Sequence, residues 1–312
     1  MEDKKIPLLV VVGPTASGKT SLGVRLAKTL SGEVISADSM QIYRDMPIAS
    51  AVPTPEEKEG VPHHLMEFLD AGEEFSVADY VNCAREKIIE INSRDKLPIL
   101  VGGTGLYVNS IVDNIEFGAQ QTSACVREKL ENEMEKIGAE AMLARLEEID
   151  PQTAARLHPN NRRRIIRALE VYETTGKTLT ELNEESRQVP SPFDTVMIGV
   201  TCRDREKLYD RINKRVDIML ESGLLDEAQK FHSRENKGAG QAIGHKEFAP
   251  YFSGECSLEE TVETLKRETR RYAKRQLTWF LRDSRINWIY IDECEDVAAE
   301  ALKIIRRAQN EG

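Results

Sequence analysis

A glycine-containing loop near the N-terminus limits the possible folds more than any other feature of this sequence. The segment GPTASGKT, from Gly13 to Thr20, matches the phosphate-binding pattern G-x-x-x-x-G-K-[ST] at every fixed position. A continuous apolar run over 6–12 precedes it, and residues 19–30 follow with helical spacing. A buried strand, a glycine loop and a helix in this order predict an α/β domain with a phosphate site at the end of the first strand.

The predicted loop specifies a di- or triphosphate but no particular nucleoside. Successive backbone N–H groups and the positive end of the following helix favour a negatively charged ligand. Lys19 adds a mobile positive charge, and the hydroxyl of Thr20 suits a Mg²⁺ ion that is also held by phosphate oxygens. The residues that we expect to bind the diphosphate are Gly13, Pro14, Thr15, Ala16, Ser17, Gly18, Lys19 and Thr20.

Strand-like and helix-like segments alternate along most of the remaining chain. This alternation predicts a parallel sheet with helices on both faces and ligands at the carboxyl ends of its strands. We therefore expect the loops after the first three strands to meet in one site. The later strands are expected at 33–36, 98–101, 195–201 and 287–291, and the helices at 76–92 with Ser76 as N-cap, 205–220, 224–231, 258–281 and the C-terminus.

Between residues 115 and 192 the strand signal is absent. Charged segments with helical character at 128–149 and 161–174 replace it. The predicted fold class is therefore α/β, with a P-loop parallel-sheet core covered by helices and a smaller all-helical insertion domain. We expect residues 1–114 and 193–312 to form the core and residues 115–192 to form the insertion.

Two further loops follow predicted strands and carry residue types suited to catalysis. Asp38 follows the second strand, where a carboxylate serves as a metal ligand, as a general base or only as the cap of a turn. The segment Gly102-Gly103-Thr104-Gly105 permits close approach of a ligand to the backbone, although it also suits a tight turn into a helix. The strand over 97–102 contains no acidic metal ligand, which counts against an ordinary ATPase.

Basic residues are grouped, although the chain of 312 residues has a formal net charge of −10. A partner responds to the local field rather than to the net charge, so these groups indicate contacts with nucleic-acid phosphates. The alternative is a solvated charged face with buried aromatic side chains. The groups are Arg162, Arg163, Arg164 and Arg167 on one helix, and Lys266, Arg267, Arg270, Arg271, Lys274, Arg275, Arg282 and Arg285 along a later one, with Trp279 and Phe280 among them.

The composition is that of a globular protein, with 40% hydrophobic and 31% charged residues. The five cysteines form no C-x-x-C pair and no metal-ligand spacing, which is typical of reduced thiols. We find no apolar run of bilayer length and no segment of signal-peptide type. We therefore expect a cytoplasmic protein that does not associate with membranes.

Six motifs together closely resemble those of the bacterial tRNA dimethylallyltransferase family, also known as tRNA isopentenyltransferases. They occur in the family's order and cover nearly the whole chain. His245 departs from the family's pattern, because a tyrosine usually follows the fifth motif, and the chain lacks the zinc-finger extension of eukaryotic relatives. The motifs are Gly13–Thr20, Asp38-Ser39-Met40-Gln41, Gly102–Tyr107, Arg167-Ala168-Leu169-Glu170, Gln241-Ala242-Ile243-Gly244 and Lys274–Trp279.

The resemblance implies transfer of a dimethylallyl group from dimethylallyl diphosphate to N6 of adenosine-37 in tRNA, with release of diphosphate. Asp38 would accept the proton of the N6 amine, and Thr104 would contact the centre where the bond forms. Lys19, Mg²⁺ on Thr20 and Arg215 would stabilise the leaving diphosphate. The family acts as a monomer, which is our expectation for this chain.

The resemblance also implies how tRNA is bound. Adenosine-37 would flip out of the anticodon loop, Gln41 is able to pair with an adenine edge, and the helical insertion would hold the anticodon stem-loop. The expected tRNA-binding residues are Asp38, Ser39, Met40, Gln41, Thr104, Arg163, Arg164, Arg167, Ala242, Ile243, Gly244, His245, Lys246, Glu247, Lys274, Arg275, Gln276, Thr278 and Trp279.

Three other functions use parts of the same pattern. A small-molecule P-loop kinase would consume ATP and would leave the basic groups without a role. An isopentenyltransferase that acts on free AMP would leave both the helical insertion and the basic helix without a task. A noncatalytic RNA-binding module would not use the phosphate loop.

Overall fold

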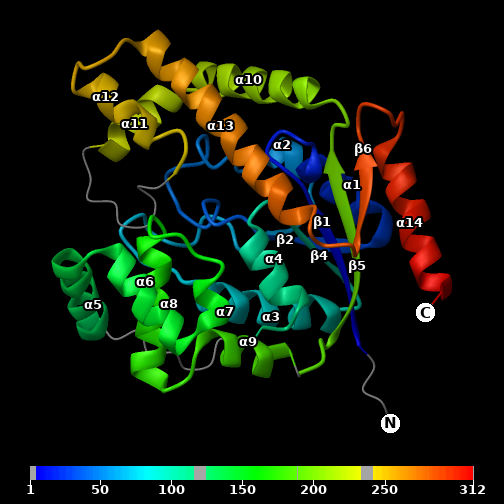
Figure 1. Ribbon diagram of the computed structural model, residues 1–312. Helices are drawn as coiled ribbons and strands as arrows, with labels where there is room; N and C mark the ends of the chain where they lie inside the picture. Colours follow the sequence, from blue (N-terminus) through cyan, green and yellow to red (C-terminus); the bar gives the residue numbers. More distant parts are fainter. Residues whose placement is uncertain (1–4, 116–123, 188, 233–241, 312) are drawn as a thin grey trace. The chain divides into compact units, whose positions relative to one another are not determined.

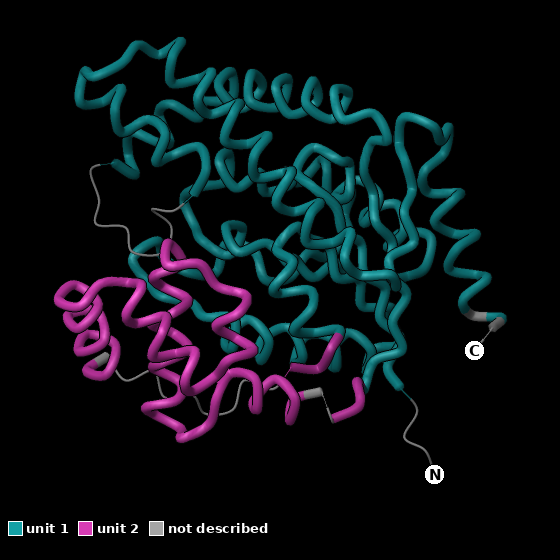
Figure 2. Tube along the Cα trace, in the orientation of Figure 1, with its two compact units in different colours: residues 1–112, 192–312 teal, residues 113–191 magenta. Residues whose placement is uncertain are grey.

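The structure is a computed structural model that describes residues 5–115, 124–187, 189–232 and 242–311 (Figure 1). The chain divides into two compact units, which Figure 2 distinguishes by colour. The larger unit comprises Met1–Val112 and Pro192–Gly312, and the smaller unit comprises Asp113–Ser191. Among the described residues, none of the helices combines the length and the apolar character that a membrane span requires.

The larger unit is built on a six-stranded sheet with the order β3-β2-β4-β1-β5-β6 (Figure 1). Every pairing between neighbouring strands is parallel, so the carboxyl ends of the strands lie at one edge. This arrangement confirms the predicted α/β class. The strands are β1 (Ile6–Val12), β2 (Gly32–Ser36), β3 (His63–His64), β4 (Leu97–Gly102), β5 (Phe193–Thr201) and β6 (Ile286–Tyr290).

Helices cover both faces of the sheet because its central strands are apolar on both sides. Helices α1 (Lys19–Leu30) and α14 (Val297–Glu311) share a core with Leu9 and Val11 of β1. Helices α3 (Val77–Ser93) and α4 (Gly105–Val112) cover the other face. The two are joined by the ring of Tyr80, which stacks on that of Tyr107 at 3.8 Å between centroids.

The helices predicted for the larger unit occur in the predicted order, and α2, η2 and α12 are additional short ones. Ser76 caps α3 as predicted, since its hydroxyl accepts a hydrogen bond from the Asp79 amide. The helix expected over 258–281 is α13, which Ser257 caps in the same way. The other helices are α2 (Pro55–Lys58), α10 (Arg205–Glu221), α11 (Leu224–His232), the 3-10 turn η2 (Lys246–Phe248), α12 (Ala249–Phe252) and α13 (Leu258–Phe280).

The described part of the smaller unit is helical and has its own core, which includes Leu130, Leu146 and Leu169. The helical character predicted over 128–149 is confirmed, but the segment is not one continuous helix. Gly138 has φ +86, a conformation that side-chain-bearing residues rarely adopt, and it divides the segment into two helices. The helices are α5 (Ala124–Ile137), α6 (Ala139–Ile149), α7 (Pro151–Ala154), α8 (Arg162–Thr175) and α9 (Leu179–Arg187).

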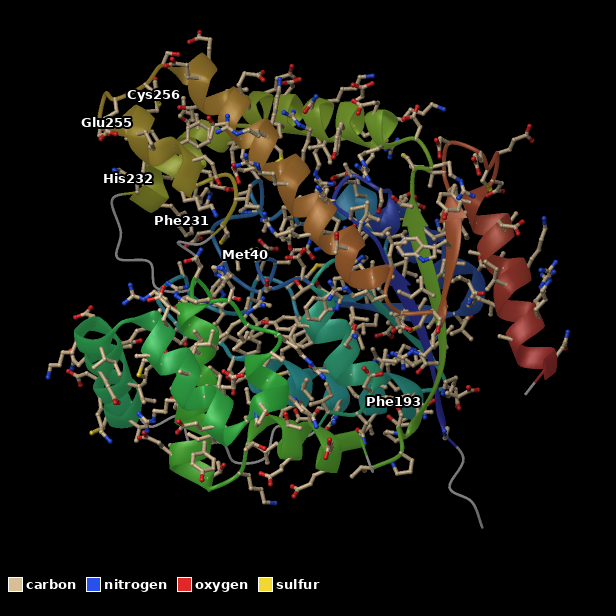
Figure 3. All side chains as sticks on the ribbon, in the orientation of Figure 1. Met40, Phe193, Phe231, His232, Glu255 and Cys256 are labelled. Atoms are coloured by element: carbon tan, nitrogen blue, oxygen red, sulfur yellow. The ribbon has the colours of Figure 1, made fainter. Side chains whose placement is uncertain are left out.

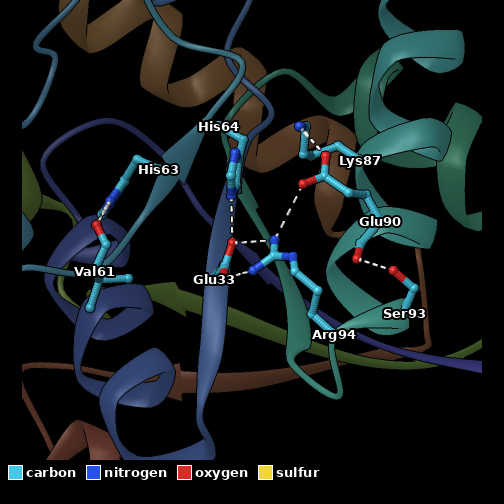
Figure 4. A network of polar contacts seen from close by, with 8 residues as sticks. All are labelled: Glu33, Val61, His63, His64, Lys87, Glu90, Ser93 and Arg94. Atoms are coloured by element: carbon cyan, nitrogen blue, oxygen red, sulfur yellow. Dashed lines mark hydrogen bonds and ion pairs between the residues drawn. The ribbon is translucent and has the colours of Figure 1, made fainter.

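The short edge strand β3 was not predicted from the sequence. A buried carboxylate holds it in place. Figure 4 shows Glu33 of β2 between His64 of β3 and Arg94 at the end of α3. The Glu33 carboxylate accepts hydrogen bonds from Arg94 at 2.5 and 2.9 Å and contacts His64 Nε2 at 2.7 Å. The hydrogen bonds from Arg94, and then that from His64, lower the pKa of Glu33 to about 2. The Glu33 carboxylate therefore joins three segments that are distant in sequence.

We predict that Glu33→Gln lowers the free energy of unfolding at pH 7 by about 2 kcal/mol, the magnitude of a hydrogen bond to a charged group. Because the folded pKa is depressed, this contribution is fully present above pH 4.5 and is lost as the pH falls toward about 2. Urea unfolding at several pH values measures it. Glu86→Gln, an exposed carboxylate of α3, is the matched control. Equal destabilisation of both variants, or a difference that does not shrink in acid, would contradict this account.

Candidate functional site

A cavity of about 310 Å³ opens at the carboxyl edge of the sheet, and all of its lining residues belong to the larger unit. The loops after β1, β2 and β4 contribute Thr15, Lys19, Thr20, Asp38, Ser39, Met40, Gln41 and Gly102, of which Met40 is labelled in Figure 3. Helices α10 and α13 contribute Arg215, Leu265, Thr269, Tyr272, Arg275 and Gln276. The other lining residues include Ala49, Ala51, His63, Met66, Ile243 and Lys246.

Hydrogen bonds hold the three loops together at this edge. The backbone amide of Thr104 donates to Ala37 O at 3.1 Å, and the Ser39 amide donates to Thr104 Oγ1 at 3.0 Å. Gln276 of α13 accepts from the Thr15 amide at 2.9 Å and donates to Gly103 O at 3.0 Å. One side-chain amide therefore connects the phosphate loop to the loop after β4.

The loops approach each other so closely that two glycines are required. A Cβ on Gly102 would lie 2.1 Å from Ala37 O, and one on Gly13 would lie 2.2 Å from Val200 O. Both clashes are with backbone atoms, which do not move away without shifting a strand. The glycines are thus explained by packing between strand ends.

Hydrogen bonds from two basic side chains hold the turns of the phosphate loop. Lys19 Nζ donates to Pro14 O at 3.2 Å, and Arg211 Nε of α10 donates to Ala16 O at 2.9 Å. Ala16 has φ +61, a left-handed conformation that is unusual for alanine and turns the loop. The buried hydroxyl of Ser17 has no hydrogen-bond partner among the described residues. These features fit a loop whose polar groups bind an anion.

Among the charged residues that line the cavity, Lys19, Arg215 and Asp38 act on one another electrostatically. Burial lowers the pKa of Lys19 to about 8, a shift that the Asp38 carboxylate opposes and the Arg215 guanidinium reinforces. Burial likewise lowers the pKa of Arg215, again opposed by Asp38. A bound polyanion would offset the repulsion between these two cations and would favour the charged form of Lys19.

One of the roles considered for Asp38 from the sequence, the cap of a turn, is present in the structure. Asp38 Oδ1 accepts a hydrogen bond from the Met40 amide at 2.9 Å, so the side chain does cap a turn. It also lines the cavity, where its charge acts on Lys19 and Arg215. The turn holds the carboxylate in one orientation toward the phosphate loop.

The described residues offer few protein ligands for a metal ion. No group of three or more histidine, cysteine, aspartate or glutamate side chains in the described ranges could hold one. The hydroxyl of Thr20 lines the cavity beside the phosphate loop. A divalent ion fits here only if phosphate oxygens and water supply most of its ligands, as is usual for Mg²⁺.

Several expected tRNA-binding side chains are occupied within the protein. The Gln41 amide accepts from Ser36 Oγ at 2.7 Å and donates to the carbonyls of Ser50 and Ala51, so it cannot pair with an adenine edge in this conformation. Gln276 is buried between its two loops, as described above.

The segment 242–247 is similarly turned inward in part. Ala242, His245 and Glu247 are buried, whereas Ile243 and Lys246 line the cavity. His245 Nε2 contacts Glu227, and Glu247 accepts from the Gly244 amide. Gln241, the first residue of this motif, lies outside the described residues.

Of the expected tRNA-binding residues on α13, Lys274, Arg275, Thr278 and Trp279 are exposed. The Trp279 ring packs against Gly105, and its Nε1 donates a hydrogen bond to Asn109 Oδ1 at 3.3 Å. Arg270 and Arg271 instead bind Asn213 and Glu268 at 2.6 Å, so part of the basic stripe is paired within the protein.

In the smaller unit, Arg163 and Arg164 are exposed on α8. Arg167 donates to Glu170 at 3.0 Å, and Arg127 of α5 donates to the same carboxylate. Glu170 is fully buried. The ion pair with the buried Glu170 anchors Arg167 to the core of its own unit.

Tyr272 and His63 also line the cavity, although the sequence patterns did not predict them as site residues. Burial raises the pKa of Tyr272, as does Asp38, while hydrogen bonds with Thr104 and Gln276 oppose the shift. Leu265, Thr269, Tyr272 and Gln276 recur at helical spacing, and this weakly charged face of a basic helix was the available signal. His63 lies on the two-residue strand β3, for which the sequence carried no periodic signal.

Proteins that are similar to this chain in sequence and fold carry the names of enzymes that act on tRNA. The model of the IPP transferase family matches residues 41–283. The chain belongs to this family. It is 51% identical over 286 residues to the tRNA dimethylallyltransferase of Halalkalibacterium halodurans and 47% identical over 291 residues to that of Bacillus subtilis, covering 91% and 92% of both chains.

Solved structures agree with this membership. The tRNA isopentenylpyrophosphate transferase of Bacillus halodurans is 46% identical, with a TM-score of 0.72 and 98% of both chains covered. A eukaryotic dimethylallyltransferase acting on tRNA is 32% identical with a TM-score of 0.81, and the match covers 96% of this chain and 77% of that one. The resemblance recognised in the sequence is thereby confirmed.

We predict that the wild-type protein takes up a proton when it binds inorganic diphosphate above pH 8, because the anion raises the pKa of Lys19 from about 8. Calorimetry in buffers of different ionisation enthalpy measures this uptake. Lys19→Met should bind diphosphate at least about 10-fold more weakly and should lack this uptake. Lys5→Met, an exposed lysine before β1, is the control. Identical proton uptake by Lys19→Met and the wild type would remove Lys19 from the diphosphate site.

Proposed function

We propose that this protein transfers a dimethylallyl group from dimethylallyl diphosphate to N6 of adenosine-37 in tRNA and releases diphosphate. The observation that carries the proposal is the cavity in which Lys19 and Arg215 lie beside the phosphate loop, with Asp38 close to both. Membership of the IPP transferase family and the names of the relatives support the same donor and acceptor.

In the proposed reaction, the adenine N6 attacks C1 of the dimethylallyl group as the bond from C1 to the diphosphate oxygen breaks. The N6 lone pair is delocalised into the ring, so loss of the N6 proton to the Asp38 carboxylate assists the attack. Negative charge grows on the leaving diphosphate, where the loop amides, Lys19 and Arg215 stabilise it. Thr104 is held beside Ser39 at the same edge and would position the reacting groups.

We propose Mg²⁺ as the ion that accompanies the diphosphate. Thr20 would hold it with its hydroxyl, and phosphate oxygens and water would complete the coordination. The bound ion would neutralise charge on the leaving group.

Flipping of adenosine-37 out of the anticodon loop would bring the base to this cavity. The exposed group Lys274, Arg275, Thr278 and Trp279 suits phosphate contacts and stacking, and we assign Arg163 and Arg164 to the same partner. His245, Glu247, Gln41 and Gln276 would position the site from within. We expect a monomer that acts on tRNA in the cytoplasm.

The direct test incubates the protein with an anticodon stem-loop RNA, dimethylallyl diphosphate and Mg²⁺, without ATP, and weighs the RNA. We expect a mass gain of one dimethylallyl group that is absent when adenosine-37 is replaced by guanosine. Parallel reactions contain AMP or ATP in place of RNA. Prenylation of AMP with unmodified RNA would establish the free-nucleotide alternative, and phosphoryl transfer from ATP would establish a kinase.

We predict that Asp38→Asn lowers kcat by about 100-fold or more, the usual contribution of a general base, while stem-loop binding stays within about 2-fold. Single-turnover rates and fluorescence anisotropy measure the two quantities. Asp45→Asn, which removes a carboxylate from the exposed part of the same loop, serves as the control. Full activity of Asp38→Asn would exclude Asp38 as the base.

A further inference from the structure

We propose that Glu227 is a positioning residue that, together with His245, fixes two facing segments of the cavity wall for the acceptor. The two segments are residues 46–51, called the wall turn, and residues 242–247, called the inner turn. The inference rests on the proposed function for its kinetic consequence, but its structural part stands on hydrogen bonds within the larger unit.

The carboxylate of Glu227 binds the wall turn through two neighbouring backbone amides. Oε2 accepts from the Ile48 amide and Oε1 accepts from the Ala49 amide, both at 2.9 Å. The Glu227 side chain projects from α11 and is only 8% exposed. A carboxylate offers two acceptor oxygens and can therefore bind both neighbouring N–H groups at once.

Gln41 holds the other end of the same turn. Its Nε2 donates to the carbonyls of Ser50 at 3.3 Å and Ala51 at 3.1 Å. The wall turn is therefore bound on its donor side by Glu227 and on its acceptor side by Gln41. Ala49 and Ala51 line the cavity, so any movement of the turn changes the cavity wall.

The inner turn is connected to the same carboxylate through His245. The His245 Nε2 lies 2.8 Å from Glu227 Oε1, which assigns the proton to Nε2 because the carboxylate is the acceptor. The His245 ring packs on Phe231, labelled in Figure 3, at 4.5 Å between centroids. Its other nitrogen, Nδ1, is buried with no partner among the described residues. Among the polar groups of the described residues, only Glu227 binds the imidazole.

The two turns also lie against each other. Because both are bound to Glu227, its carboxylate is their common anchor. A Cβ on Gly244 would lie 3.2 Å from Ala49 Cβ, and Gly244 has φ +109, which favours glycine. Ile243 and Lys246 of the inner turn line the cavity. Glu227 therefore controls the placement of Ala49, Ala51 and Lys246 without lining the cavity itself.

The test uses Glu227→Gln, which keeps the shape of the side chain but replaces one acceptor oxygen by an NH₂ group that faces an amide donor. Asp226→Asn, at the adjacent and exposed position of α11, is the matched control. We expect hydrogen exchange of the Ile48 and Ala49 amides to accelerate by about 10-fold or more, while the amides of β1 keep their rates. We expect KM for the stem-loop RNA to rise about 5-fold to 10-fold with kcat within about 2-fold.

A second pair of variants separates positioning from a loss of folding. His245→Leu removes the Nε2–H donor, and His245→Gln places an amide N–H near the same point. We expect the raised KM in His245→Leu and its return toward the wild-type value in His245→Gln. This pair decides the question if Glu227→Gln does not fold.

Unchanged exchange at Ile48 and Ala49 in Glu227→Gln would overturn the inference, as would equal KM values for His245→Leu and the wild type. If the protein modifies no RNA, the proposed function fails. The exchange rates then decide alone whether Glu227 anchors the wall turn, so the two failures are distinguishable.

Discussion

The side-chain amide of Gln276 is the interaction on which the arrangement of the site depends most. It accepts from the Thr15 amide and donates to Gly103 O, so it sets the spacing between the phosphate loop and the loop after β4. The third loop joins through Thr104, whose amide and hydroxyl bind Ala37 and Ser39. Because a parallel sheet brings its strand ends to one edge, three short connections are enough to place Lys19, Asp38 and Thr104 together.

The charge of this edge explains why the loop suits a leaving group. Lys19 and Arg215 are buried and repel each other, and Asp38 balances them only in part. In the proposed reaction, negative charge develops on the diphosphate when the bond to carbon breaks, and fixed cations favour that change without reorganising. Asp38 lies near the same cations, so one small region would both accept a proton and hold the departing anion.

Much of the fold is predictable from patterns among residues that are close in sequence. The strands, the glycine loop and the Ser76 cap follow from apolar runs, turn residues and helical spacing. The division of the first insertion helix at Gly138 was missed, because helical spacing on both sides of a single glycine suggested continuity. The strand β3 was missed because it has two residues and is held by Glu33, 31 residues away.

The same limit applies to the site. The phosphate loop and Asp38 stand out as motifs, whereas the partners of Gln41, Gln276 and Glu227 lie up to 261 residues away and have no local signal. Gln41 and His245 were assigned to tRNA from their motifs, but their hydrogen bonds are made within the protein. A motif identifies the residues of a site without saying which of them face the ligand.

The central claim is that the phosphate loop holds a diphosphate that leaves from carbon. Phosphorus NMR of a reaction containing dimethylallyl diphosphate, stem-loop RNA and Mg²⁺ tests it most directly. The account predicts one inorganic diphosphate released for each RNA modified, no release without RNA, and no change in added ATP. Release of orthophosphate, or consumption of ATP in step with product, would contradict it.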